Sequence, residues 1–292
     1  MAQYLNKRRR WSTAKILQYT FAILALLIAL GILLTWLFLR YQNGSDTGKD
    51  KPVEPVQEET IISTEPTNCL LIFDFEDAER FVLVQANAGQ KRITTVPLPA
   101  TIADADGCTL AEAFHRHGAQ SVTKTVSNVL ELPLEHYIAL TPNGVEQFLS
   151  ALGSGITFSI PEKVSYVENG ATIQLSTGEQ MLSPSQVRIL LTYTKWKNTE
   201  YRTNLAAELT TAVLNQYLVK DRPFEHYFSS LSNVCTTKLR YDNFYAYLPT
   251  LQYLAASNDG NLCQQITLPG SKKNGIFTPS LKTFRTDSGL YE

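Results

Sequence analysis

The 292-residue sequence lacks the motifs that mark several common enzyme classes. It contains no Gly-x-Ser-x-Gly elbow, no Walker loop and no His-Glu-x-x-His, so serine hydrolase, P-loop and zincin activities have no support. Its 4 cysteines are too widely spaced for a zinc finger. A hydrophobic fraction of 44% with 18% charged residues nevertheless predicts a folded protein with a substantial core.

Acidic residues are absent from residues 1–40, which contain six basic residues. The whole chain has 26 basic and 27 acidic residues, so residues 41–292 carry 20 minus 27, a net charge of −7. A nucleic-acid-binding protein needs a broad basic surface, and this acidic body argues against nucleic-acid partners.

An uncharged run of nineteen residues, 21–39, follows the basic segment. At about 1.5 Å rise per residue, a helix of this length approximates the hydrocarbon core of a bilayer. We therefore expect a cytoplasmic segment over 1–15, a transmembrane signal-anchor helix over 16–40 and an extracellular remainder, because basic residues favour the cytoplasmic side. A cleaved signal peptide is the alternative, but the run is long for one and ends without a small-x-small cleavage site.

Residues 41–67 are rich in Gly, Pro, Ser, Thr and acidic side chains, which is typical of an extracytoplasmic linker. We expect a folded domain over 68–285 and a short C-terminal tail over 286–292. Within the domain, short apolar runs alternate with segments of helical period, which predicts an α/β fold. The expected strands are 69–73, 80–86, 91–96, 136–140, 156–161 and 187–191, and the expected helices are 109–117, 119–130, 142–152 and 201–218.

The order of these segments resembles that of LytR-CpsA-Psr proteins over residues 68 to about 285. The segments that carry the resemblance are 68–73, Thr95-Val96-Pro97, Glu135-His136-Tyr137, 148–157, 178–182 and Thr267-Leu268-Pro269-Gly270. The resemblance implies a membrane-anchored α/β/α domain with a central mixed sheet flanked by helices. It also implies transfer of a glycopolymer phosphate from a polyprenyl-pyrophosphate carrier to peptidoglycan of the bacterial wall.

Several charged residues of that family have no counterpart here. The family's Arg-Asp pair falls on Leu98 and Pro99, and its Arg-x-Arg pair falls near Thr192 and Thr194, whereas Arg202 matches a family arginine. Three missing arginines remove roughly 5 to 9 kcal/mol of charge-assisted hydrogen bonding if the losses add. We therefore expect weakened or lost phosphotransferase activity and a regulatory or scaffolding role in cell-envelope assembly. An active divergent transferase and an interaction module for a wall-assembly partner are the alternatives.

Phosphoryl transfer between large anions needs cations on the pyrophosphate and carboxylates on a divalent metal. Asp74 and Asp77 follow the first strand, at the edge where α/β sheets hold their sites, and oxygen ligands suit Mg or Ca rather than zinc. A solvated acidic turn is the alternative. The candidate catalytic residues are Arg202, Asp74 and Asp77, and the candidate substrate-binding residues are Arg80, Arg188, Lys195 and Lys197.

Three of these candidates also have ordinary structural explanations. Arg188 would point to solvent from a half-covered strand. Lys195-Trp196-Lys197 would contact a lipid headgroup or a sugar, or form a solvated loop. Extracellular cysteines can form disulfides, and Cys235 and Cys263 are the predicted pair because they bracket the C-terminal unit.

Two apolar groups leave their roles open. Tyr241, Phe244 and Tyr245 recur at helical spacing, which favours a helix packed on the core over a glycan-stacking surface. Leu98 and Ile102, with Val96, either line a lipid-tail tunnel or fill the interior.

Overall fold

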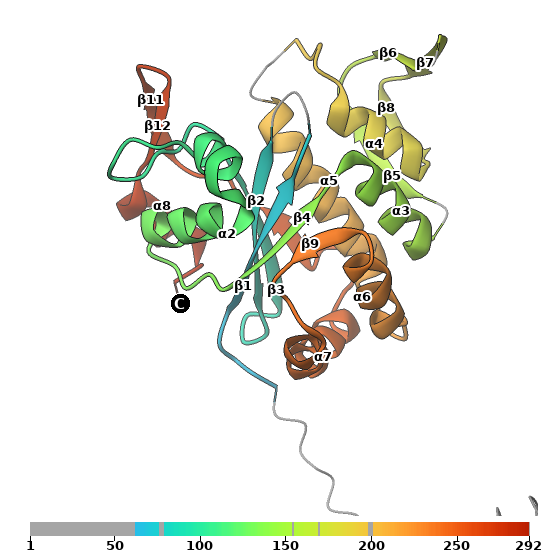
Figure 1. Cartoon of the computed structure of the whole chain (residues 1–292). Coiled ribbons are helices and arrows are strands. Elements are labelled where there is room, and N and C mark those ends of the chain that lie inside the picture. The colour runs from blue at the N-terminus through green and yellow to red at the C-terminus, as the bar shows by residue number, and fades with distance from the viewer. Residues whose placement is uncertain (1–61, 76–78, 154, 169, 198–200, 292) are drawn as a thin grey trace, which may run out of the picture. The chain divides into compact units, whose positions relative to one another are not determined.

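The computed structural model describes residues 62–291, apart from 76–78, 154, 169 and 198–200 (Figure 1). The expected segments 1–15 and 16–40 and most of the linker lie outside these residues. Within the described part, no helix is both long and apolar enough to cross a membrane. The elements are β1 (Thr67–Phe73), β2 (Arg80–Asn87), β3 (Arg92–Leu98), α2 (Leu110–Leu130), β4 (His136–Leu140), α3 (Pro142–Leu152), β5 (Ile156–Ile160), β6 (Val164–Glu168), β7 (Ala171–Leu175), β8 (Gly178–Leu182), α4 (Pro184–Thr192), α5 (Tyr201–Tyr217), α6 (Phe224–Ser232), β9 (Cys235–Thr237), α7 (Tyr241–Ala256), β10 (Cys263–Gln265), β11 (Gly270–Lys273), β12 (Ile276–Pro279) and α8 (Leu281–Ser288).

A six-stranded mixed sheet in the order β10-β3-β2-β1-β4-β9 forms the centre of the domain. β1, β2 and β3 form an antiparallel meander, while β4 runs parallel to β1 and β10 runs parallel to β3. The turn between β2 and β3 is closed by Asn87, whose side-chain oxygen accepts a hydrogen bond from the Gln90 amide at 3.0 Å. The predicted strands 69–73, 80–86, 91–96 and 136–140 are confirmed.

Alternation along β1 separates the two faces of this sheet. Leu70 and Ile72 are fully buried and belong to an apolar core beneath α2, together with Phe284 from α8. Cys69 and Leu71 are half-buried and face the layer that contains α3, α5, α6 and α7. Figure 1 shows α2 and α8 on one face of the sheet and α3, α5 and α6 on the other. The predicted α/β/α arrangement with a central mixed sheet is confirmed.

Local capping explains where α2 begins and bends. Thr109 accepts a hydrogen bond from the Glu112 amide, and the Glu112 carboxylate accepts one from the Thr109 amide at 2.9 Å. Gly118 has φ 74°, a conformation that glycine adopts without steric cost. The two predicted helices, 109–117 and 119–130, therefore form one kinked element.

The strand predicted at 187–191 is wrong, because these residues lie in α4. Ser183 caps this helix, and the Gln186 side-chain oxygen accepts a hydrogen bond from the Ser183 amide at 2.8 Å. Pro184 occupies the first helical position, where its missing N–H costs nothing. A five-residue apolar run fits a buried strand or a buried helix equally well, so this cap decides the structure.

The antiparallel strand pair β5–β8 and the hairpin β6–β7, which lies between these two strands in the chain, extend from the helical layer beside α4. At Gly155 a Cβ atom would clash with the Leu182 carbonyl oxygen, so only glycine allows β5 to start this close to β8.

The segment predicted as a C-terminal tail packs into the domain instead. Leu290 is 2% exposed, and its carbonyl oxygen accepts a hydrogen bond from the Gln85 side chain at 2.9 Å. The domain therefore continues at least to Tyr291, beyond the expected boundary at residue 285.

Candidate functional site

An elongated apolar cavity lies between the sheet and the helical layer. It has two adjoining parts, with volumes of about 300 and 210 Å³, which share Ile138, Phe148, Leu214 and Leu231 in their walls. Almost every side chain around it is aliphatic or aromatic. The first part is also lined by Cys69, Val84, Ile93, Leu218, Phe228, Phe244 and Leu251, and the second by Leu71, Phe73, Leu140, Val145, Leu149, Val187, Leu191, Leu209 and Val213.

A polar pocket of about 580 Å³, here called the mouth, lies at the carboxyl ends of β1 and β4. The parallel register aligns Phe73 with Leu140, and the Asp74 amide donates a hydrogen bond to the Leu140 carbonyl at 2.9 Å. Ligand sites of α/β sheets form where parallel strands end in this way. The mouth is lined by Asp74, Phe75, Arg80, Thr141, Pro142, Tyr166, Arg188, Thr192 and Thr194.

Four pairs of consecutive residues lie between the mouth and the apolar cavity, with one residue of each pair lining each pocket. Leu140 lines the cavity and Thr141 lines the mouth, and the same holds for Leu191 and Thr192. Phe73 with Asp74 and Val187 with Arg188 repeat this pattern on β1 and α4. Because neighbouring residues lie within a few ångströms along the chain, the mouth lies close to the second part of the cavity.

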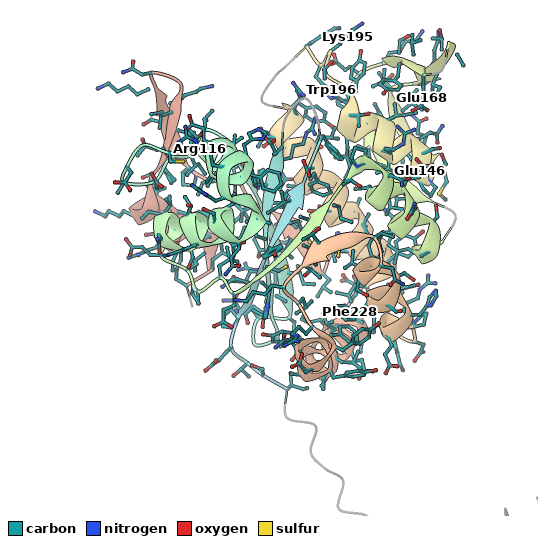
Figure 2. The ribbon with its side chains drawn as sticks, in the orientation of Figure 1. Arg116, Glu146, Glu168, Lys195, Trp196 and Phe228 are labelled. Atoms are coloured by element: carbon teal, nitrogen blue, oxygen red, sulfur yellow. The ribbon has the colours of Figure 1, made fainter. Side chains whose placement is uncertain are left out.

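Arg188 is held between two carboxylates at the edge of the mouth. Its Nε atom lies 2.6 Å from Oε2 of Glu146 on α3, and its Nη2 atom lies 2.9 Å from Oε1 of Glu168 on β6. Figure 2 shows both glutamates on the α3 and β6 side of the domain. Burial acts to lower the pKa of Arg188, but the hydrogen bonds to Glu146 and Glu168 outweigh it and raise the pKa. Its charge is therefore permanent and already balanced by two anions.

Arg80 and the start of α3 also lie at the mouth. Arg80 is 5% exposed, and its guanidinium lies 5.1 Å from the centre of the Phe75 ring. Thr141 caps α3, and its side chain accepts a hydrogen bond from the Gly144 amide at 3.1 Å. The first turn of a helix carries a partial positive charge, so the mouth suits an anionic group.

The metal prediction on Asp74 and Asp77 stays a prediction. Asp74 lies exposed in the mouth, whereas Asp77 lies outside the described residues. Among the residues that the structure describes, no group of three or more His, Cys, Asp or Glu could hold a metal ion.

The remaining predicted cations lie elsewhere. Arg202 is in the first turn of α5, and its half-buried side chain leaves Nη2 without a hydrogen-bond partner in the described part of the chain. Lys195 and Lys197 are exposed, and Nζ of Lys197 lies 3.9 Å from a Glu162 carboxylate oxygen. None of the three lines the mouth.

Trp196 is a core residue and not an exposed contact for a headgroup or a sugar. It is 5% exposed, and its ring packs edge-on between Tyr193 and Tyr201 at centroid distances of 5.1 and 5.0 Å. The basic residues on either side of it are therefore surface residues of a loop with a buried anchor.

The predicted disulfide between Cys235 and Cys263 is wrong, because both residues are free thiols on opposite edges of the sheet. Cys235 lies in β9 and Cys263 in β10, which are separated by five inter-strand spacings of about 4.8 Å. A disulfide needs Cα atoms within about 7 Å.

The open question on Val96, Leu98 and Ile102 is also answered. All three are at most 1% exposed and belong to the core beneath α2, so they fill the interior. The apolar cavity lies on the other face of the sheet. Phe244 is buried at its wall, while Tyr241 and Tyr245 are exposed.

Sequence reasoning missed Glu146, Glu168 and Tyr166 as neighbours of the mouth. They come from α3 and β6, and no local motif marks them. Thr192 and Thr194 were singled out only as positions where the family carries arginines, and both line the mouth.

The described part of the chain thus combines a polar mouth with a long apolar cavity beside it. The sequence pattern described as the LytR_cpsA_psr family matches residues 74–285. The chain belongs to this family.

The chain is also similar to individual known proteins in sequence or in fold. Over 81 residues the chain is 32% identical to the polyisoprenyl-teichoic acid–peptidoglycan teichoic acid transferase TagU of Halalkalibacterium halodurans. This match spans only 26% of each protein. Among solved structures, a protein from Eubacterium siraeum superposes with a TM-score of 0.69 at 17% identity, covering 83% of this chain and 99% of that one. TagV of B. subtilis superposes with a TM-score of 0.64 at 15% identity, covering 78% and 97%. At these identities the superpositions show the fold alone.

Proposed function

We propose that this protein binds a polyprenyl-linked glycopolymer carrier in cell-envelope assembly, with weakened or lost phosphotransferase activity and a regulatory or scaffolding role. The observation that carries the proposal is the position of the polar mouth beside the apolar cavity, with four pairs of consecutive residues between them. An isoprenoid tail fits an apolar channel, and its phosphate-bearing end fits a mouth with Arg80 and a helix start. The name of the matched TagU relative points to the same class of substrate.

The charges around the mouth support the proposal of reduced activity. Thr192 and Thr194 offer hydroxyl groups where the family carries an Arg-x-Arg pair. Arg188 is balanced by Glu146 and Glu168, so it adds little attraction for a pyrophosphate in this conformation. Each charge-assisted hydrogen bond that is lost costs about 1.5 to 3 kcal/mol of transition-state stabilisation.

Localisation at the cell membrane is part of this proposal and rests on the sequence. Residues 16–40 would form one membrane-spanning helix, with the N-terminus in the cytoplasm and the domain outside. The carrier lipid and the peptidoglycan acceptor would then both be within reach of the domain.

The test is lipid mass spectrometry on the full-length protein purified in detergent. We expect a polyprenyl phosphate or pyrophosphate in a ratio near one per protein. Leu214→Trp, which fills the cavity at a residue shared by its two parts, should remove this lipid. Val167→Trp adds the same ring at an exposed position and should retain it. A folded wild-type protein that carries no such lipid and takes up none when it is added would refute carrier binding.

An active divergent transferase is the second candidate, because Arg80 and Arg188 both line the mouth. Turnover of a lipid-linked glycopolymer with Mg and peptidoglycan, abolished by Arg80→Ala or Arg188→Ala, would favour it over the regulatory role. If Arg188→Ala, Lys195→Ala and Arg202→Ala all leave such turnover intact, the transferase built on these cations fails. Capture of a wall-assembly protein without any bound carrier lipid would instead favour the interaction module.

A further inference from the structure

The apolar cavity has a direction within the domain. Its polar mouth lies at the carboxyl end of β1, and its other end is lined by Thr67 and Cys69, from the beginning of the same strand. Phe228 of α6 lies at this second end, and Figure 2 shows it far from Lys195 and Trp196 at the opposite end of the domain. The chain therefore enters the domain at the end of the cavity opposite the mouth, here called the tail end.

Two tyrosines on α7 form an exposed aromatic patch at this end. Tyr241 and Tyr245 are 49% and 51% exposed, with ring centroids 6.5 Å apart. They are backed by Phe228 and Phe244, whose rings stack at 4.2 Å and whose side chains line the cavity. The Phe228 ring also packs edge-on against Tyr241 at 5.0 Å. The patch is thus the outer surface of the cavity wall at this end.

Cations lie directly beside the aromatic patch. Lys238 and Arg240 are exposed and line a surface hollow of about 470 Å³. Within the described part of the chain neither forms a salt bridge, although Glu135 lines the same hollow and Asp242 is exposed beside Tyr241. Exposed tyrosine rings next to unpaired basic side chains are typical of surfaces in the headgroup region of a bilayer.

The chain outside the structure indicates what covers this surface. Residues 1–61 precede the described part and include the uncharged run 21–39, and they lead into β1 at the end of the domain that carries the patch. If the cavity holds an isoprenoid tail, as the proposed function states, the tail can pass between cavity and bilayer without crossing water only where this end meets the membrane.

We propose that the surface formed by Tyr241, Tyr245, Lys238 and Arg240 rests on the anionic phospholipid bilayer. The tyrosine rings lie among the lipid headgroups, and the two cations contact lipid phosphates. The mouth then faces away from the membrane, toward the wall, with any glycopolymer head.

Hydrogen exchange measured by mass spectrometry on the full-length protein tests this surface. The protein is compared in nanodiscs that contain phosphatidylglycerol, in phosphatidylcholine nanodiscs and in detergent, all without polyprenyl lipid. We expect exchange over 238–247 to slow by about tenfold in the anionic nanodiscs relative to detergent, and by less in the neutral ones. Because no carrier lipid is present, this result is independent of carrier binding.

Matched variants locate the contact. Tyr241→Ser with Tyr245→Ser should abolish the slowing, and so should Lys238→Gln with Arg240→Gln. Val167→Ser with Met181→Ser changes two residues that are 66% and 64% exposed on β6 and β8, and it should leave the slowing intact. Unchanged exchange in β1 to β3 shows that each variant is folded. If the tyrosine variant is unfolded, the result for the Lys238→Gln, Arg240→Gln variant decides whether the surface contacts lipid.

Binding of a different ligand at this surface would overturn the proposal, and each such ligand would give a distinct exchange result. Slowing of the same peptide in detergent by inorganic phosphate alone would show a free-anion site. Slowing by soluble peptidoglycan fragments would show a glycan-stacking platform. No slowing in anionic nanodiscs would show that the surface does not contact the bilayer, and equal slowing in neutral ones would show that it does not recognise anionic headgroups.

Discussion

Nη2 of Arg188, on α4, lies 2.9 Å from Oε1 of Glu168, the last residue of β6. This contact ties the β6–β7 hairpin to the edge of the mouth and occupies a guanidinium face that an anionic ligand would need. The Glu146 carboxylate contacts Nε of the same guanidinium, so Arg188 forms ion pairs with two carboxylates.

Removing the Glu168 charge should therefore strengthen binding of an anionic head. We expect Glu168→Gln to raise the affinity for a soluble short-chain polyprenyl pyrophosphate by about fivefold, since a partly exposed ion pair contributes about 1 kcal/mol. Isothermal titration calorimetry measures the change. Glu162→Gln, which alters a carboxylate beside Lys197, is the matched control and should leave the affinity unchanged. Equal or weaker binding by Glu168→Gln would contradict the competition.

The loop between α4 and α5 should depend on its tryptophan for stability. Trp196→Ala removes a buried ring between two tyrosines and should lower the free energy of unfolding by about 3 to 5 kcal/mol. Urea denaturation followed by circular dichroism gives this value. Lys195→Ala should have no measurable effect, because the side chain is exposed. If Trp196→Ala kept full stability but lost ligand binding, the loop would instead be a binding surface.

His136 should make stability depend on pH. Its Nε2 atom lies 3.0 Å from the Tyr247 hydroxyl, and its residue is 7% exposed. Burial lowers its pKa below 6.5, with Lys238 also lowering it and Glu135 opposing the shift. The unfolded chain then binds the proton more readily than the folded one, so the stabilisation is present above pH 6.5 and is lost as pH falls through the folded pKa.

Melting temperatures between about pH 5 and pH 8 test this dependence. His136→Gln should flatten the acid side of the profile relative to wild type, while His226→Gln, which alters an exposed histidine, should not. If wild type and His136→Gln give identical profiles, His136 is not the source of the pH dependence of stability.

All four cysteines should be free thiols in the purified protein. Intact mass should be the same with and without reductant, and a thiol reagent in denaturant should modify all 4 residues. Burial raises the pKa of Cys235 to about 11 and that of Cys263 to about 12, so both should react slowly while the protein is folded. A mapped peptide joining Cys235 to Cys263 would contradict the sheet order.

Local sequence determined much of the fold. The apolar runs at β1, β2 and β4 and the turn chemistry at Asn87 predict strands that the structure contains. These features are encoded by residues a few positions apart, since side-chain alternation and turn hydrogen bonds depend only on near neighbours. The order of segments also carried the resemblance to the family that the chain proves to belong to.

Only the tertiary structure decided the chemistry of the site. Arg188 meets Glu146 and Glu168 from 42 and 20 residues away, so no local pattern contains this contact. The cysteine pairing failed for the same reason, because bracketing in sequence says nothing about which sheet edge a strand joins. The sequence by itself determined where strands and helices of regular period lie and which family arginines are missing. Packing settled which residues line the mouth, where the cavity runs and which charges are already balanced, because these depend on side chains brought together from distant segments.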